Sequence, residues 1–187
     1  MPICRAPGGG HMAKVPARTF ARGLTLVELV IVIGIAMVLA LVAMPSFRDA
    51  LSATRQNSAL GLLVSDLNLA RGEAIKRNAR VLVCAKNAAA TDCGLLTNWA
   101  SGWLVCADTD GDNSCDDPTA DLPNPLLVRP ALDSSLTLNA SSALLRFNAN
   151  SSQGGGGASF LLTVGGTWAG ASNRVVTVAA TGNVTRP

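Results

Sequence analysis

The cysteines are the side chains in this sequence whose number and spacing point most directly to chemistry. Of five cysteines in the chain, four lie close together as Cys84, Cys93, Cys106 and Cys115. An even number of cysteines in an exported domain is typical of disulfides. We favour the local pairs Cys84–Cys93 and Cys106–Cys115, which close loops of about ten residues and contribute roughly 2.5–3 kcal/mol each in a loop-entropy account. The cross-strand pairs Cys84–Cys106 and Cys93–Cys115 are the alternative, whereas an oxidising compartment disfavours a zinc site of four thiolates.

A short acidic run follows the third of these cysteines. Asp108, Asp110 and Asp112 alternate with other residues, as in the start of a calcium loop, where alternating carboxylates converge on one hard cation. The twelfth position of such a loop is Thr119 rather than a glutamate, and no flanking helices are expected. We therefore keep the three aspartates as weak calcium candidates and favour a solvated acidic turn after a strand.

Histidine is nearly missing from the sequence, which excludes several kinds of catalysis. The single histidine, His11, and the fifth cysteine, Cys4, both lie near the start of the chain. Without histidine, the rest of the chain cannot build a Ser–His–Asp or Cys–His site, and it lacks the most common ligand of transition metals. No spacing of serine with lysine or of paired carboxylates points to another catalytic site. We expect no enzymatic activity, no cofactor and no resident metal ion.

The chain is organised around an apolar segment between Gly23 and Pro45. Between these two residues, every residue is apolar except Thr25 and the charged Glu28. About 21 residues at ~1.5 Å per helical residue span roughly 30 Å, the thickness of a hydrocarbon core, in which such a segment must be helical. A carboxylate there costs up to ~2.5–3.5 kcal/mol and therefore suggests a function. A plain membrane anchor and a cleaved secretory signal are the alternatives, and neither accounts for Glu28.

The start of this segment, Gly23-Leu24-Thr25-Leu26-Val27-Glu28-Leu29, resembles the processing signal of type IV pilins and type II secretion pseudopilins. That family has glycine at the end of a basic leader, glutamate as the fifth mature residue and proline as the twenty-second, which match Gly23, Glu28 and Pro45. Leu24 stands where the family usually has phenylalanine. The resemblance implies cleavage between Gly23 and Leu24 by a prepilin peptidase, N-methylation of Leu24, and filament assembly through the helix, with Glu28 as an assembly residue. Pro45 is also expected to kink the helix, because proline lacks a backbone donor.

Basic residues before the apolar segment orient the chain in a membrane. Such flanks stay in the cytoplasm, and here they are Arg5, Lys14, Arg18 and Arg22. We therefore expect a leader at 1–23, a transmembrane helix at 24–45 and a periplasmic domain at 46–187. The protein would cross the inner membrane once and be extractable into a periplasmic filament. Met1 and Met12 are both candidates for the first residue. All 12 acidic residues follow the leader, so the processed chain is slightly negative despite the formal charge of +3 for the full chain.

An amphipathic helix is expected to continue from residue 46 to about Asn78, since asparagine suits the left-handed position that ends a helix. Apolar residues at spacings of three and four place one stripe on its surface, formed by Leu60, Leu63, Leu67, Ala70 and Ala74. The last ten residues of this helix, L-A-R-G-E-A-I-K-R-N, resemble its end in the GspH/FimT subgroup of pilin-like proteins. Trp99, Gly102 and Trp103 resemble the subgroup's W-x-x-G-W strand entry, and we expect the tryptophans to be core or rim residues.

Short β-type runs, separated by glycine, asparagine, serine and proline, follow the helix. We expect antiparallel strands at Val81–Cys84, Gly102–Ala107, Leu126–Val128, Ser135–Leu138, Leu144–Phe147, Phe160–Val164 and Val175–Ala179. Strands and helices do not alternate, so a parallel sheet is not expected. The predicted fold class is therefore α+β and pilin-like: a long N-terminal helix, with a transmembrane half and an amphipathic half, packed on antiparallel β-sheet.

Together these features predict a minor pilin or pseudopilin, a structural subunit of a type II secretion pseudopilus or a type IV pilus. The implied partners are other pilin or pseudopilin subunits, the prepilin peptidase, an inner-membrane assembly platform and membrane lipid. The alternative is a FimT-like minor pilin that binds DNA for uptake in natural transformation. The tail of such proteins resembles G-R-x-R, whereas Asn183 and Thr185 stand at the two arginine positions here. Arg174 and Arg186 are the candidates for DNA contact, and DNA binding is not favoured.

Overall fold

The computed structural model describes residues 23, 25–116 and 123–186. Its elements are the helix α1 (Leu26–Arg77) and, within these residues, the strands β1 (Arg80–Ala85), β2 (Trp103–Asp108), β3 (Leu127–Val128), β4 (Leu136–Ala140), β5 (Leu144–Phe147), β6 (Phe160–Gly166), β7 (Arg174–Val178) and β8 (Val184–Thr185). The chain divides into two units, Met1–Val42 and Ala43–Pro187, and α1 contributes to both. Except for Gly23, the expected leader lies outside the described residues.

The first unit contains the beginning of α1, whose apolar side chains are exposed. Leu26 and Leu41, for example, are 78% and 75% exposed. No single straight helix among the described residues is both long and apolar enough to cross a membrane. The bent pair Leu26–Leu41 and Ser46–Arg77 meets both conditions when taken together, by length and composition alone. The transmembrane helix at 24–45 and the kink at Pro45 therefore stay predictions.

In the second unit, α1 buries the apolar stripe that the residue spacing predicts. Leu67, Ala70 and Ala74 are fully buried, because residues three and four apart share one helical face. The helix ends at the predicted place, and Asn78 has a φ of 50°. The Asn78 amide donates to the carbonyl of Ile75, and the next amide donates to the carbonyl of Ala74. These are the two bonds of a Schellman motif, which satisfy carbonyls that the helix end leaves free.

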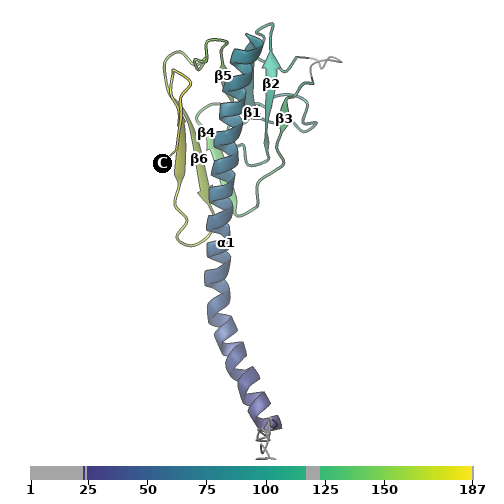
Figure 1. The fold of residues 1–187 in the computed structure, drawn as a ribbon, viewed down its shortest axis with the longest axis vertical. Coiled ribbons are helices and arrows are strands. Elements are labelled where there is room, and N and C mark those ends of the chain that lie inside the picture. Colours follow the sequence, from purple (N-terminus) through teal and green to yellow (C-terminus); the bar gives the residue numbers. More distant parts are fainter. Residues whose placement is uncertain (1–22, 24, 117–122, 187) are drawn as a thin grey trace, which may run out of the picture. The chain divides into compact units, whose positions relative to one another are not determined.

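Two antiparallel sheets complete the second unit, with strand orders β3-β2-β1-β5 and β4-β6-β7-β8. Figure 1 shows the later part of α1 running across both of them. The α+β fold class is confirmed, and every strand expected from the sequence is present with ends shifted by a few residues. β8 was not expected, because two residues are too few to show a period. The division into two sheets was not expected either, since strand pairing depends on contacts between distant segments.

The main core lies between α1 and the two sheets. It combines Leu67 of α1 with Val83 and Val105 of the first sheet and with Leu162 and Val176 of the second. Side chains alternate between the faces of a strand, so each of these residues comes from the face that meets the helix. The helix and both sheets therefore share one core, which fixes the segments that carry the candidate sites.

A second, smaller apolar cluster lies on the other face of the first sheet. Leu82, Cys84, Leu104 and Cys106 are buried there, and partly buried residues from the loops pack against them. A sheet face that does not meet a helix usually faces water. Here the loops that follow β1 and β2 cover it, because a cysteine in each loop is bonded to the strand before it.

Candidate functional site

The predicted processing site lies at the beginning of α1. Gly23 is exposed, and Leu24 lies outside the described residues. Thr25 precedes the helix as its N-cap: its Oγ1 accepts a hydrogen bond from the backbone N–H of Glu28 at 3.2 Å, and its carbonyl accepts one from Leu29 at 3.1 Å. Threonine followed three residues later by glutamate is the pattern of a capping box. The sequence contains this signal for where the helix begins, although the prediction from sequence did not use it.

The carboxylate of Glu28 is exposed at the first turn of α1. Within the described part of the chain it forms no ion pair and accepts no hydrogen bond. A negative charge at this position is favoured by the helix dipole, which gives the residue a local structural role in its own helix. The same position leaves both carboxylate oxygens available to a cation or to donors of another molecule.

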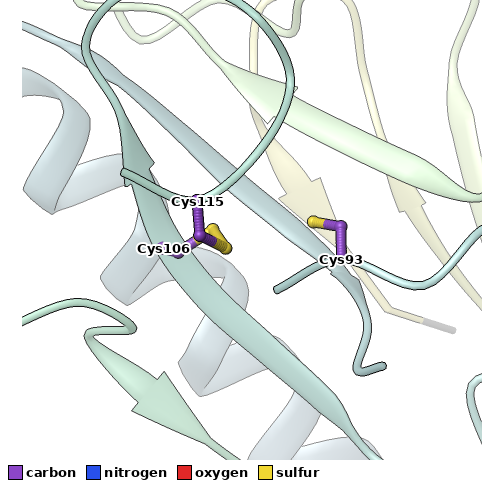
Figure 2. Close-up of side chains that lie close together, drawn as sticks. All are labelled: Cys93, Cys106 and Cys115. Carbon is purple, nitrogen blue, oxygen red and sulfur yellow. A yellow bond between two sulfur atoms is a disulfide. The ribbon is translucent and has the colours of Figure 1, made fainter. Parts of the chain in front are cut away.

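Both local disulfides that the sequence favoured are present. Cys84 is bonded to Cys93 and Cys106 to Cys115, with Cα atoms 5.5 Å apart in each pair. Each bond joins a strand residue to the loop that follows the strand. Figure 2 shows Cys106 and Cys115 joined, with Cys93 beside them. The cross-strand pairs that were the alternative are therefore not the ones formed.

Asp108, the first residue of the acidic run, is buried and already paired. Its Oδ2 accepts a hydrogen bond from Arg80 Nη2 at 2.8 Å, and its Oδ1 accepts one from the backbone N–H of Gly111 at 2.7 Å. A buried carboxylate needs such partners, because desolvation of an unpaired charge is costly. Arg80 therefore supplies the positive charge that a calcium ion would have to replace.

The other acidic residues divide between two environments. Carboxylate oxygens of Asp108, Asp110 and Asp116 lie within 4.8 Å of one another, so the structure brings Asp116 to this group rather than the predicted Asp112. Asp112 instead accepts a hydrogen bond from the Ser114 hydroxyl at 2.6 Å, which lowers the pKa of its carboxyl group. These contacts favour the hydrogen-bonded acidic turn over the calcium loop.

Arg174 and Arg186, the candidates for DNA contact, lie close together. With Asn57 and Leu60 of α1 they line a hollow of about 280 Å³. The antiparallel register of β7 and β8 causes this convergence, because Val178 pairs with Val184 and the strands then run in opposite directions. Among the described residues, neither arginine forms an ion pair. The structure thus gathers two cations from the ends of two strands over one helix.

A buried acidic residue joins α1 to the first sheet. Asp66 accepts hydrogen bonds from Trp103 Nε1 at 3.0 Å and from Arg129 Nε and Nη2 at 2.9 and 2.8 Å. The hydrogen bond to Asp66 raises the pKa of the Arg129 guanidinium group. Asp66 is not one of the apolar residues whose spacing predicts the buried stripe of α1, so its burial was not expected from the sequence. Its partner is far away in the chain, and no local pattern in the sequence marks such a pair.

The W-x-x-G-W segment owes its glycine to close contact between backbones. Of the two expected places, core or rim, Trp99 and Trp103 both lie in the core. Gly102 has a φ of 109°, and a Cβ atom there would collide with the backbone oxygen of Arg129. The Gly102 amide also donates to the carbonyl of Trp99 at 3.0 Å. The motif is therefore a tight turn that places two core tryptophans, and only glycine fits it.

Comparisons with known proteins agree with this architecture. Residues 59–182 match the model of the family described as Type II transport protein GspH. Among solved structures, the fold is similar to that of the type IV minor pilin FimU of Pseudomonas aeruginosa in two crystal forms. One match has a TM-score of 0.51 at 18% identity and covers 70% of this chain and 91% of FimU. The other has a TM-score of 0.55 at 17% identity and covers 72% and 90%. No curated protein matches the chain.

Proposed function

We propose that this chain, which belongs to the GspH family of type II transport proteins, is a minor pilin or pseudopilin. It would be a structural subunit of a type II secretion pseudopilus or a type IV pilus. The observation that carries the proposal is an exposed apolar helix segment that begins within the processing motif, three residues after Gly23, and bears Glu28 in its first turn. This segment lies outside residues 59–182, so it supports the proposal independently of the family match. An exposed apolar surface of this kind needs lipid or another protein to cover it.

The processing of the chain is part of the same proposal. A prepilin peptidase would cut between Gly23 and Leu24, and Leu24 would then be N-methylated. Before assembly the protein would cross the inner membrane once, with its domain in the periplasm. An inner-membrane platform would then transfer it from lipid into a filament made of other pilin or pseudopilin subunits. The role is structural rather than enzymatic.

Glu28 distinguishes this helix from a plain membrane anchor. An unpaired carboxylate in lipid or in an apolar filament core is expensive, so a partner would strongly favour the assembled state. The N-terminal amine released by cleavage is such a partner, on the same chain or on a neighbouring subunit. The Thr25 hydroxyl and carbonyl accept hydrogen bonds only from backbone N–H groups of the first turn. The cap therefore leaves the Glu28 carboxylate for this pairing.

The proposal is tested in cells that contain an active prepilin peptidase. Mass spectrometry of the membrane-extracted protein should show a chain that begins at methylated Leu24. Glu28→Ala should be cleaved as well as the wild type but should be lost from sheared filaments, whereas Asp49→Ala serves as a control for an acid later in α1. An intact leader in these cells, or normal incorporation of Glu28→Ala, would contradict the proposal.

A second candidate function is the binding of DNA during uptake. The observation that favours it is the convergence of Arg174 and Arg186 on one hollow beside α1. Two neighbouring arginines can contact consecutive phosphates of a DNA backbone. The opposing observation is the slightly negative charge of the processed chain, which gives no general attraction for DNA. We therefore rank a structural role in a filament first.

A further inference from the structure

The two disulfides lie in contact with each other. The sulfur atoms of Cys93, Cys106 and Cys115 all lie within 4.8 Å of one another, and Figure 2 shows these three side chains. Cys106 and Cys115 form one disulfide, and Cys93 belongs to the other, with Cys84. The Cys93 sulfur thus lies close to both sulfurs of the Cys106–Cys115 bond. Because exchange requires a thiolate to reach a disulfide sulfur, this closeness makes the two bonds candidates for exchange with each other.

Hydrogen bonds hold the four cysteines in this arrangement in addition to the two sulfur–sulfur bonds. A single oxygen of Asp92, Oδ1, accepts hydrogen bonds from the backbone N–H of Cys93 at 2.7 Å and of Cys115 at 2.9 Å. The pairing of β1 with β2 places Cys84 opposite Leu104, and Cys106 two residues further along β2. Both strand cysteines therefore lie on the same face of the sheet, and Asp92 joins the two loop cysteines above them.

The four cysteines differ in their access to solvent. Cys84 and Cys106 are fully buried in the small apolar cluster, whereas Cys93 and Cys115 are half-buried. A thiolate from another molecule can therefore attack a loop cysteine but not a strand cysteine, because exchange requires access to the sulfur that is attacked. Attack on either loop cysteine releases the buried cysteine of that pair.

We propose that the two disulfides form one thiol–disulfide exchange unit, in which a dithiol enters at Cys115 and the exchange passes from Cys106 to Cys93. The dithiol attacks the Cys115 sulfur, so the Cys106–Cys115 bond breaks and Cys106 leaves as a thiolate. Cys106 attacks the Cys93 sulfur, so the Cys84–Cys93 bond breaks and a Cys93–Cys106 bond forms. The second thiol of the same dithiol then attacks the dithiol's own sulfur in the mixed disulfide with Cys115. Cys115 leaves as a thiolate.

The electrons and atoms of this sequence balance. The dithiol becomes a disulfide, and its two protons end on the thiols of Cys84 and Cys115. The protein gains two electrons and keeps one disulfide, Cys93–Cys106. In the starting state each loop is tied to the strand before it. In the product the first loop is tied to β2, and the loop after Cys106 is no longer tied to a strand. A dithiol oxidoreductase is the class of partner that would use this unit, because it supplies the reacting pair of thiols.

The experiment uses the full chain in detergent with Cys4→Ser, so that only these four cysteines can react. Cys84→Ser leaves a Cys93 thiol beside the intact Cys106–Cys115 bond. After incubation at about pH 8, where a free thiol is partly ionised, the free thiol should be found on Cys115 as well as on Cys93, because Cys93 forms the bond with Cys106. Rapid alkylation and peptide mapping report its position. The matched control is Cys93→Ser, whose Cys84 thiol is not one of the three mutually close sulfurs, and its free thiol should stay on Cys84.

A second variant tests the role of Asp92. In the Cys84→Ser chain, Asp92→Ala should slow the redistribution several-fold, because the two loop cysteines lose their shared acceptor. Asp92→Asn keeps an amide oxygen and should restore the rate. If Cys84→Ser does not fold, limited reduction of the wild type with dithiothreitol replaces it and should yield a species linked between Cys93 and Cys106. A free thiol found only on Cys93, or wild-type intermediates with native pairs alone, would overturn the proposal.

Discussion

At the scale of single residues, Asp66 shows how the domain keeps a buried charge. Its side chain is 3% exposed and receives bonds from one indole and one guanidinium group. The attraction between buried ions mostly offsets the desolvation of both, so the intact pair contributes little net stability. Removing Arg129 is different, because it leaves the buried carboxylate of Asp66 without compensation. Removing Asp66 leaves a half-buried guanidinium group that water can partly solvate. The pair therefore determines where α1 lies against β2 and the segment after β3.

The first prediction concerns this buried pair. Asp66→Asn should lower the free energy of unfolding of residues 46–187 by about 1.5–3 kcal/mol, since Trp103 Nε1 and the half-buried Arg129 lose a charged acceptor and one amide hydrogen of asparagine opposes Arg129. Urea unfolding followed by circular dichroism measures the change. Asp133→Asn is the matched control, because it removes a more exposed ion pair with Arg55 and should change stability little. Equal effects of the two variants would show that burial of Asp66 has no special role.

At the scale of elements, the features that interactions between nearby residues determine could be predicted from local sequence patterns. The stripe on α1, its end at Asn78 and the strands after it follow from periodicity and turn residues within a few positions. The division into two sheets and the pair of Asp66 with Arg129 depend on segments far apart in the chain, and a single sequence shows no pattern for such contacts. The convergence of Arg174 and Arg186 has the same cause, because it depends on the pairing of β7 with β8.

The second prediction separates two glycines that look alike in the sequence. A Cβ at Gly102 would meet the backbone of Arg129, and its φ is positive, whereas a Cβ at Gly61 in α1 would meet nothing within 4 Å. Gly102→Ala should lower the free energy of unfolding of residues 46–187 by about 1–3 kcal/mol. Gly61→Ala should stabilise them by up to ~1 kcal/mol, because alanine favours the helix. Thermal unfolding of both variants measures the effects, and a neutral Gly102→Ala would mean that the turn can rearrange.

At the scale of the whole molecule, carboxylates whose pKa is lowered in the folded state contribute to how the domain responds to acid. The bond from the Arg77 side chain is the main cause that lowers the pKa of Glu73, and the bond from Ser135 lowers that of Asp133. In the unfolded chain, such groups bind protons at about pH 4. The folded state binds them only at lower pH. The stability from these groups is therefore present above that range and is lost as the pH falls through the lowered values.

The third prediction follows from this dependence of stability on pH. Glu73→Gln should lower the melting temperature of residues 46–187 at neutral pH, because the two ion pairs of Glu73 with Lys76 and Arg77 are lost. The difference between the variant and the wild type should shrink as the pH falls below about 4 and through the lowered pKa of Glu73, since the Glu73 contribution is lost there. Calorimetry at a series of pH values measures both. A difference that is independent of pH would mean that Glu73 acts through packing rather than through charge.

The last prediction concerns DNA and uses the charge of the molecule as a whole. Arg174 and Arg186 supply two phosphate contacts at one hollow, while Arg146 donates to Asn113, next to the acidic turn. Two contacts release few counterions, so the logarithm of the binding constant should fall with the logarithm of salt concentration with a slope of only about −2. We expect an anisotropy titration of residues 46–187 with duplex DNA to show no low-micromolar binding near physiological salt. Low-micromolar binding with a steeper slope, abolished by Arg174→Ala with Arg186→Ala but retained in Arg146→Ala, would instead establish DNA capture as the function.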